Sequence, residues 1–412
     1  MLPETLAEVL MNWIGASAVL AYLTFVVTRS VRSGMENRLA VLLACGAIFM
    51  VARGFMWLTG EPAARIVAMF SVGLFPLLLI LFIEQLLRRH SPPFVKFTVA
   101  VATGGFSYLS LFTIFPRSAA TALLVYELFV FVVIAVIIIR RDKKSLSEPE
   151  NHLIESIGVA SIIILPLIIT DFQTVIDMPI MRVGSITILV FIFTLTRQSS
   201  ASRETGAFLR GILSITLYGL VLGLVFASIS VTAELFRDQS ASITLSIVQP
   251  YIALGIALAF LIRILDRLVA MRRESRSRSF QNWLSTAKTT SITEFVQSVL
   301  RYAPLKNCIL VSKKVLADYD ITSMRPLFDE HGSLLSLENL NTISRQDQNE
   351  QLRFAAEQLI DLLGRNQCNQ FCLLAEQPAT ALLVNIPTVA GAVRLNMELV
   401  VINKIAEALN CG

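Results

Sequence analysis

Ionisable side chains inside long apolar segments are the residues of this sequence whose chemistry is most informative. Glu127 lies near the middle of one such segment, within Tyr126-Glu127-Leu128. A charged group in the hydrocarbon core of a bilayer is costly, so a carboxylate retained there usually has a function or a partner. Glu127 is therefore a candidate proton or cation site, or a polar contact for a ligand. The alternative is a structural role, in which a protonated Glu127 hydrogen-bonds to a neighbouring helix.

Three further charged residues, Arg53, Asp171 and Arg182, fall toward the ends of apolar segments. Together with Trp57 they can line a polar pocket at the outer end of a helical bundle, where they are candidate ligand or ion contacts. The alternative is that Arg and Trp side chains simply extend to the membrane interface, as they commonly do. The sequence alone leaves both interpretations open.

No residue pattern predicts catalysis or a metal site. The only histidines are His90, His152 and His331, and they are scattered along the chain. Cys368 and Cys372 are close in sequence, but no second Cys or His pair at ligand spacing accompanies them, which argues against zinc. Phosphate-binding loops, nucleophile elbows and paired catalytic carboxylates are also missing from the sequence. We therefore expect a protein that is not an enzyme and that has no metal and no cofactor.

These candidate residues belong to a chain whose composition is typical of a membrane protein. Of its 412 residues, 55% are hydrophobic and only 16% are charged, whereas soluble domains average about 25% charged residues. The apolar residues concentrate in 1–270, while 271–412 has an ordinary globular composition. The composition predicts an α-helical polytopic membrane bundle followed by a small cytosolic α+β domain.

A transmembrane helix needs about 20 mostly apolar residues. Nine segments meet this requirement: 7–28, 39–59, 63–87, 94–115, 118–139, 151–171, 179–196, 207–233 and 243–268. The weakest are 94–115 and 179–196, so seven or eight spans are the alternatives. The first segment is not expected to be a cleavable signal peptide, because the first residues of the chain carry Glu4 and Glu8 and no Lys or Arg, and no convincing cleavage site follows the apolar run.

The charges between these segments predict the orientation of the bundle, because cytoplasmic loops carry an excess of Lys and Arg. Basic residues follow every odd-numbered segment: Arg29, Arg32 and Arg38; Arg88, Arg89 and Lys96; Arg140, Arg141, Lys143 and Lys144; Arg197 and Arg203; Arg272, Arg273, Arg276 and Arg278. The even-numbered breaks are nearly neutral or acidic. The alternation predicts an outer N-terminus and a cytoplasmic C-terminal domain.

The net charge of +5 is explained by these loops, so we expect no nucleic acid partner. The basic cluster after the last segment, at Arg272, Arg273, Arg276 and Arg278, is predicted to lie beside anionic lipid head groups, where each residue contributes about 1 kcal/mol. Four of the five cysteines follow residue 300 and are expected to be free thiols in a reducing cytoplasm. Membrane lipids are therefore the partners that the sequence itself predicts.

The C-terminal part is predicted to contain a basic and amphipathic helical linker, 271–303, and an α+β domain, 304–412. A strand is expected at 308–312, the pattern at 319–324 is ambiguous, and the turn His331-Gly332 precedes Leu334-Leu335. An amphipathic helix is expected at 351–363, an antiparallel hairpin at 370–375 and 380–386, and a final amphipathic helix at 395–409.

The end of the chain carries a resemblance to a known family. The strand Ala381-Leu382-Leu383-Val384-Asn385-Ile386-Pro387 is followed by a short break and a long helix in which Glu398 lies near the start. This order is similar to that of a GAF domain, a small sensory domain of bacterial signalling proteins. Together with the multi-pass segment, it resembles the front half of a bacterial membrane sensor kinase in the inner membrane.

The resemblance implies a sensor that passes a signal from the membrane bundle to a cytosolic partner or through a homodimer. The signature of cyclic-nucleotide-binding GAF domains, an attachment Cys for a bilin, a phosphoacceptor His segment and an ATP-binding region are all missing from the sequence. We therefore expect the output to come from a partner. A transporter or channel with a cytosolic regulatory domain is the first alternative, and a membrane enzyme acting on lipid-linked substrates is the second.

Overall fold

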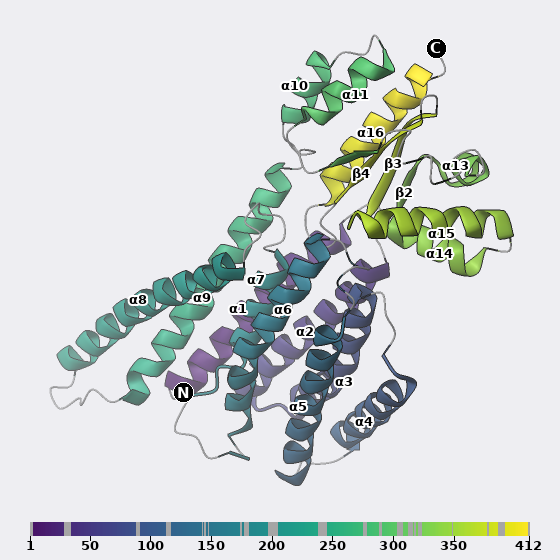
Figure 1. Cartoon of the computed structure of the whole chain (residues 1–412). Helices are drawn as coiled ribbons and strands as arrows, with labels where there is room; N and C mark the ends of the chain where they lie inside the picture. Colours follow the sequence, from purple (N-terminus) through teal and green to yellow (C-terminus); the bar gives the residue numbers. More distant parts are fainter. Residues whose placement is uncertain are drawn as a thin grey trace. The chain divides into compact units, whose positions relative to one another are not determined.

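The chain forms two compact units (Figure 1). The first comprises Met1–Arg141 and Leu153–Val269, and the second comprises Asp142–His152 and Ala270–Gly412. The computed structural model describes residues 3–28, 34–87, 91–112, 117–141, 143, 146, 148–173, 175–176, 181–196, 205–237, 245–274, 278–287, 291–302, 308–311, 316, 319, 324–347, 349–376, 379–385 and 392–410. The predicted boundary at residue 270 thus lies next to the observed one, but the loop Asp142–His152 belongs to the second unit.

The first unit is built from helices. They are α1 (Pro3–Val27), α2 (Gly34–Thr59), α3 (Pro62–Leu87), α4 (Pro93–Phe112), α5 (Arg117–Ile139), α6 (Glu148–Ile169), the 3-10 turn η2 (Thr170–Phe172), α7 (Ser185–Thr196), α8 (Thr205–Arg237) and α9 (Leu245–Glu274). Helices α6 and α9 each run from one unit into the other without a break. Helices α1, α2 and α3 pack in sequence order, and α7 returns to pack against α1.

Seven of the described helices, α1 to α6 and α8, are long and apolar enough to cross a bilayer. The chain is therefore a multi-pass membrane protein. Of the nine predicted segments, 179–196 is represented by α7, a shorter apolar helix of 12 residues, and residues 245–268 of the segment 243–268 lie within α9. The count of nine spans remains a prediction.

Helix α7 begins at Ser185, whereas the predicted segment began at residue 179. Hydrogen bonds explain why the helix starts further along the chain. The backbone N–H of Val183 donates to Thr170 Oγ1 at 3.0 Å, and that of Gly184 donates to Asp171 Oδ1 at 3.2 Å. A helix start requires free N–H groups or a capping partner. Here the hydrogen-bond partners are the Thr170 and Asp171 side chains, directly after α6. Residues 181–184 are held beside them, and α7 starts only after this segment.

The second unit contains a four-stranded antiparallel sheet in the order β1-β4-β3-β2. The strands are β1 (Ile309–Val311), β2 (Leu334–Ser336), β3 (Gln370–Glu376) and β4 (Ala379–Val384), and the helices of the unit are α10 (Arg278–Thr286), α11 (Ile292–Leu300), α13 (Arg325–His331), α14 (Leu337–Gln346), α15 (Glu350–Arg365) and α16 (Ala392–Asn410). In register, Phe371 lies opposite Leu383 on one side and Leu335 on the other.

Alternate residues of the sheet face two different cores, as the period of a strand requires. Phe371 and Leu383 pack with the apolar side chains of α13, α14 and α15. Cys372 and Leu382, one position along each strand, pack with those of α11 and α16. The unit is therefore an α+β fold of three layers, with the sheet in the middle (Figure 1).

The predicted hairpin, the predicted helix 351–363 and the final helix are confirmed as β3–β4, α15 and α16. Helices α13 and α14 were not predicted. Local signals for both are present, because Pro326 begins α13 and the Ser336 side chain accepts a hydrogen bond from the Asn339 N–H at the start of α14. Both helices are short, with 7 residues in α13 and 10 in α14, which leaves little sequence from which to recognise them.

The predicted linker is folded onto the second unit. Phe280, Trp283, Phe295 and Tyr302 form one aromatic cluster between α10 and α11, with Trp283 and Tyr302 ring centroids 5.0 Å apart. Trp283 Nε1 donates to the Ser298 carbonyl at 3.0 Å. Since these rings also join the core beneath α16, α10 and α11 move with the domain.

Each unit carries a buried free cysteine: Cys45 in α2 and Cys372 in β3. Burial and, to a smaller extent, the nearby Glu407 carboxylate raise the pKa of the Cys372 thiol to about 12. Cys308 and Cys368 are also free, while Cys411 lies outside the described residues. A buried protonated thiol is unreactive, so alkylation of Cys45 or Cys372 reports the opening of its own unit.

Candidate functional site

A cavity of about 660 Å³ lies within the first unit. Its walls come from α2, α3, α5, the end of α6 with η2, and residues 182–187. The walls are mainly aromatic, aliphatic and Met side chains, among them Phe49, Met50, Met69, Phe75, Leu123, Phe131 and Phe172. Cavities of this size, with apolar walls and a few polar groups, are typical sites for small organic molecules.

All four candidate residues of the sequence analysis line this cavity: Arg53, Glu127, Asp171 and Arg182. Trp57 lines it too, as does Arg65 of α3, which the sequence analysis did not single out. The four come from α2, α5, η2 and the segment before α7, so the tertiary structure brings them together across long stretches of sequence.

Arg53 and Asp171 form a buried bidentate ion pair. The guanidinium donates from Nη2 to Asp171 Oδ1 at 2.8 Å and from Nη1 to Oδ2. The Arg53 side chain is 9% exposed and that of Asp171 is 21% exposed. A fork of two parallel hydrogen bonds is the strongest geometry available to a guanidinium and a carboxylate, so this pair holds α2 against the end of α6.

Gly184 allows this arrangement. A Cβ atom added at Gly184 would overlap the Asp171 carboxylate, so any side chain there would displace the carboxylate from Arg53. Because η2 places Asp171 beside residues 181–184, one carboxylate accepts hydrogen bonds from both Arg53 and the Gly184 backbone. The position of α7 is thereby linked to the ion pair.

Arg182 lies over the ring of Trp57, with its guanidinium carbon 4.6 Å from the ring centroid. Its Nη1 lies 3.7 Å from Oε2 of Glu8 in α1. Two donors of this stack, Arg182 Nε and Trp57 Nε1, are buried without a hydrogen-bond acceptor in the described part of the chain. Arg182 therefore has contacts of its own within the bundle, rather than extending freely to the interface.

Glu8 is a member of this network that the sequence analysis missed. It is buried within α1, and its neighbour Asn12 accepts a hydrogen bond from the Ser185 hydroxyl at 3.0 Å. A signal was present, because Glu8 and Asn12 are one helical turn apart and so share a face. Their position near the N-terminus suggested a solvated helix start instead.

Glu127 projects into the cavity from the face of α5 that also carries Leu123 and Phe131. Its carboxylate lies within electrostatic range of Arg53 and Asp171. Among the described residues no hydrogen bond or ion pair to this carboxylate is found. The adjacent Tyr126 instead points to α4, where its hydroxyl hydrogen-bonds to Thr103 Oγ1 at 2.8 Å.

The predicted lipid-facing basic cluster lies around the end of α9 and the start of α10. Arg272 and Arg273 lie in the last turn of α9, and Arg278 is the first residue of α10. Arg276 lies outside the described residues, as do the side chains of the other three. Their interaction with lipid head groups remains a prediction.

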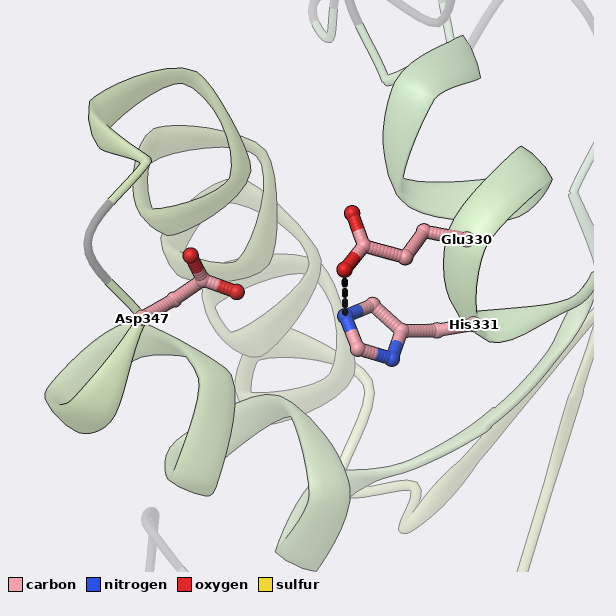
Figure 2. A group of neighbouring side chains, drawn as sticks. All are labelled: Glu330, His331 and Asp347. Atoms are coloured by element: carbon pink, nitrogen blue, oxygen red, sulfur yellow. Dashed lines mark ion pairs between the residues drawn. The ribbon is translucent and has the colours of Figure 1, made fainter.

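A second group of neighbouring side chains lies in the second unit (Figure 2). Glu330 and His331 end α13 and Asp347 follows α14, with one potential ligand atom of each within 4.8 Å of the others. Glu330 Oε1 and His331 Nε2 are 4.0 Å apart. No metal site was expected from the sequence, because α13 and α14, which bring these three residues together, were not predicted. Glu330 and His331 are exposed, and three such side chains do not by themselves define a metal site.

Comparison with known proteins identifies no relative: no family model matches the chain, and no curated protein or solved structure is similar to it.

Proposed function

We propose that this chain is a membrane-embedded sensor. Its bundle binds a small amphipathic molecule in the cavity of the first unit, and its C-terminal domain passes the signal to a cytosolic partner. The observation that carries the proposal is the cavity itself, in which a buried Arg53–Asp171 pair and Glu127 face a large apolar volume. Intramembrane charges of this kind usually mark a site of ligand or ion recognition.

The connection between the units supports a signalling role. Helix α6 begins in the second unit at Glu148–His152 and ends at the cavity, where Asp171 follows it directly. A ligand that strains or releases the Arg53–Asp171 pair acts on the end of this helix. Helix α9 also continues into the second unit, and the aromatic cluster of α10 and α11 holds the next segment to the domain. In the proposed mechanism, these continuous helices carry a displacement from the cavity toward the second unit.

The layers of the second unit support a GAF-like sensory or relay domain. A sheet lies between α13–α15 and α11–α16, and a long final helix follows β4 after a break, which is the order on which the resemblance was based. We propose that this domain lies in the cytoplasm and that the bundle lies in the inner membrane of a bacterial cell. The segment Asp142–His152 contains Lys143 and Lys144 of a break predicted to be cytoplasmic, and its grouping with the domain supports their location on one side.

The proposed orientation is tested with reporter fusions. Fusions after Ser145 and Ser200 are expected to report the cytoplasm, and fusions after Asp177 and Gln239 the outside. The reason is the alternation of basic loops along the chain. An opposite result at any one of these sites would contradict the orientation, because each span determines the side of the next loop.

The cavity is tested with a filling substitution. Ala120→Phe places a ring in the cavity wall on α5 and is expected to weaken binding of a neutral aromatic probe, 2-(2-naphthyl)ethanol, at least about tenfold, because the ring occupies the volume that the probe needs. Binding is measured by calorimetry on the full chain in nanodiscs, with empty nanodiscs subtracted. Ala135→Phe, on an exposed position of the same helix, is the matched control and is expected to bind the probe like the natural chain.

Hydrogen exchange then tests whether binding is transmitted. The probe is expected to change exchange in α10 and α11 of the natural chain and of Ala135→Phe, but not of Ala120→Phe. Binding that leaves exchange in the second unit unchanged would contradict the sensor. It would favour a transporter with Glu127 as its coupling site, a candidate supported by the lack of any cationic partner for Glu127 among the described residues.

A further inference from the structure

Not every charged residue around the cavity has a partner of opposite charge among the described residues. Asp171 has Arg53 as its partner, and Glu8 has Arg182 nearby. Glu127 is left as the carboxylate without an ion pair or hydrogen bond in the described part of the chain, and Arg53, which lies within its electrostatic range, is already paired with Asp171. Arg65 also lines the cavity, but it lies near the start of α3 and is exposed, so solvent screens its charge from groups further inside.

The surroundings of Glu127 make an ionised carboxylate without a partner unfavourable in free energy. On the same face of α5, the cavity residues one turn away are Leu123, Val130 and Phe131, which offer no hydrogen bonds. A carboxylate in an apolar site needs a compensating donor or a countercharge. An occupant of the cavity can supply one.

We infer that the ligand of this cavity is a cationic amphiphile, in which an ammonium or related nitrogen cation binds Glu127 and an aromatic or branched apolar body fills the rest of the cavity. The inference rests on the proposed function, because it takes the cavity as the binding site. The apolar body matches the walls formed by Phe49, Phe75 and Phe131, whose ring faces also attract a cationic nitrogen.

Two other head groups fit less well. An anionic group could accept from the buried donors Arg182 Nε and Trp57 Nε1, but Arg53 and Arg182 already have a carboxylate beside them, and the anion would add to the charge of Glu127. A hard metal ion needs about six oxygen ligands, whereas the neighbours of Glu127 on its face of α5 are hydrocarbon. An organic cation needs only the one carboxylate and the apolar walls.

Three probes that share one body separate these cases: 2-(2-naphthyl)ethylamine, 2-(2-naphthyl)ethanol and 3-(2-naphthyl)propanoate. Their affinities for the full chain in nanodiscs are measured by calorimetry near neutral pH, at which the amine is an ammonium ion. We expect the ammonium probe to bind at least about tenfold more tightly than the alcohol, since a charge-assisted hydrogen bond is worth that much. The carboxylate probe is expected to bind the most weakly of the three.

Substitutions test whether Glu127 causes the preference for the ammonium probe over the alcohol. Glu127→Gln is expected to reduce the preference for ammonium over alcohol to about threefold or less, and measurable binding of the alcohol by this variant shows that its cavity is still formed. Glu127→Asp keeps the charge and is expected to keep part of the preference. Glu155→Gln is the matched control, because Glu155 pairs with Arg141 at 2.9 Å and does not line the cavity.

The outcomes distinguish this inference from the proposed function. Equal binding of all three probes, blocked by Ala120→Phe, would overturn the cationic ligand and leave the cavity as a binding site. Tighter binding of the carboxylate probe, or an ammonium preference that survives Glu127→Gln, would also overturn it. If none of the probes binds, both the cationic ligand and the binding role of the cavity are contradicted.

Discussion

Arg53→Met is expected to lower the free energy of unfolding of the bundle by about 3–5 kcal/mol. The substitution keeps a long side chain of similar volume but removes the guanidinium that donates two hydrogen bonds to Asp171. The Asp171 carboxylate, 21% exposed, then keeps only the Gly184 N–H as a donor. The loss is large because a partly buried charge is left without its countercharge.

The extent of alkylation of Cys45 measures this decrease in the free energy of unfolding. Cys45 is buried in α2, on the same helix as Arg53, and peptide mass spectrometry follows its labelling as the mole fraction of SDS rises in mixed micelles. In the Arg53→Met background, Asp171→Asn is expected to recover part of the stability, because it removes the unpaired charge. Partial recovery identifies the lost charge pairing as the cause.

Arg263→Met is the matched control for Arg53→Met. Arg263 pairs with Asp266 at 3.8 Å, but its side chain is 53% exposed, so the same substitution is expected to cost no more than about 1 kcal/mol. If Arg53→Met costs as little as Arg263→Met, the ion pair does not hold the end of α6. A ligand would then have no such contact through which to act.

Phe371→Ala is expected to destabilise the second unit by about 3–5 kcal/mol. Phe371 is 1% exposed in β3, packs with the core formed by α13, α14 and α15, and stacks on Phe328 with ring centroids 5.8 Å apart. Truncation removes the buried ring and leaves a cavity that neighbours anchored to a sheet and three helices cannot fill. The midpoint of urea-induced alkylation of Cys372 in the full chain is expected to fall accordingly.

Phe354→Ala is the control, because Phe354 lies on α15 in the same unit but is 58% exposed. Its replacement is expected to change stability by no more than about 0.5 kcal/mol. Calorimetry with 2-(2-naphthyl)ethanol completes the test: Phe371→Ala is expected to leave binding in the cavity unchanged, because the two units have separate cores. A loss of stability as large in Phe354→Ala would contradict the placement of Phe371 in the main core.

Local properties of the chain were sufficient to predict most of its elements. A bilayer imposes a minimum length of apolar sequence, so segments such as 63–87 could be read without knowing their neighbours, and α3 (Pro62–Leu87) matches that range. Alternation of apolar residues likewise predicted β3 and β4, and amphipathic periodicity predicted α15 and α16. Each of these signals is complete within one stretch of sequence.

Where contacts between distant segments set an element's bounds, the sequence was insufficient. The start of α7 depends on hydrogen bonds from Val183 and Gly184 to the end of α6. The short helix α14 packs mainly against α15 and β2, and that packing supplies stability which its own length cannot. The assignment of Asp142–His152 to the second unit is equally a matter of contacts.

The candidate site shows the same division. The sequence by itself determined which residues were unusual, because a charged side chain in an apolar segment can be recognised from its immediate neighbours. Only the tertiary structure decided that Arg53 pairs with Asp171, 118 residues away, that Glu8 joins Arg182, and that Glu127 has no such partner among the described residues. The physical reason is that electrostatic and hydrogen-bond energies depend on distance in space, and helix packing, which no single segment encodes, sets those distances.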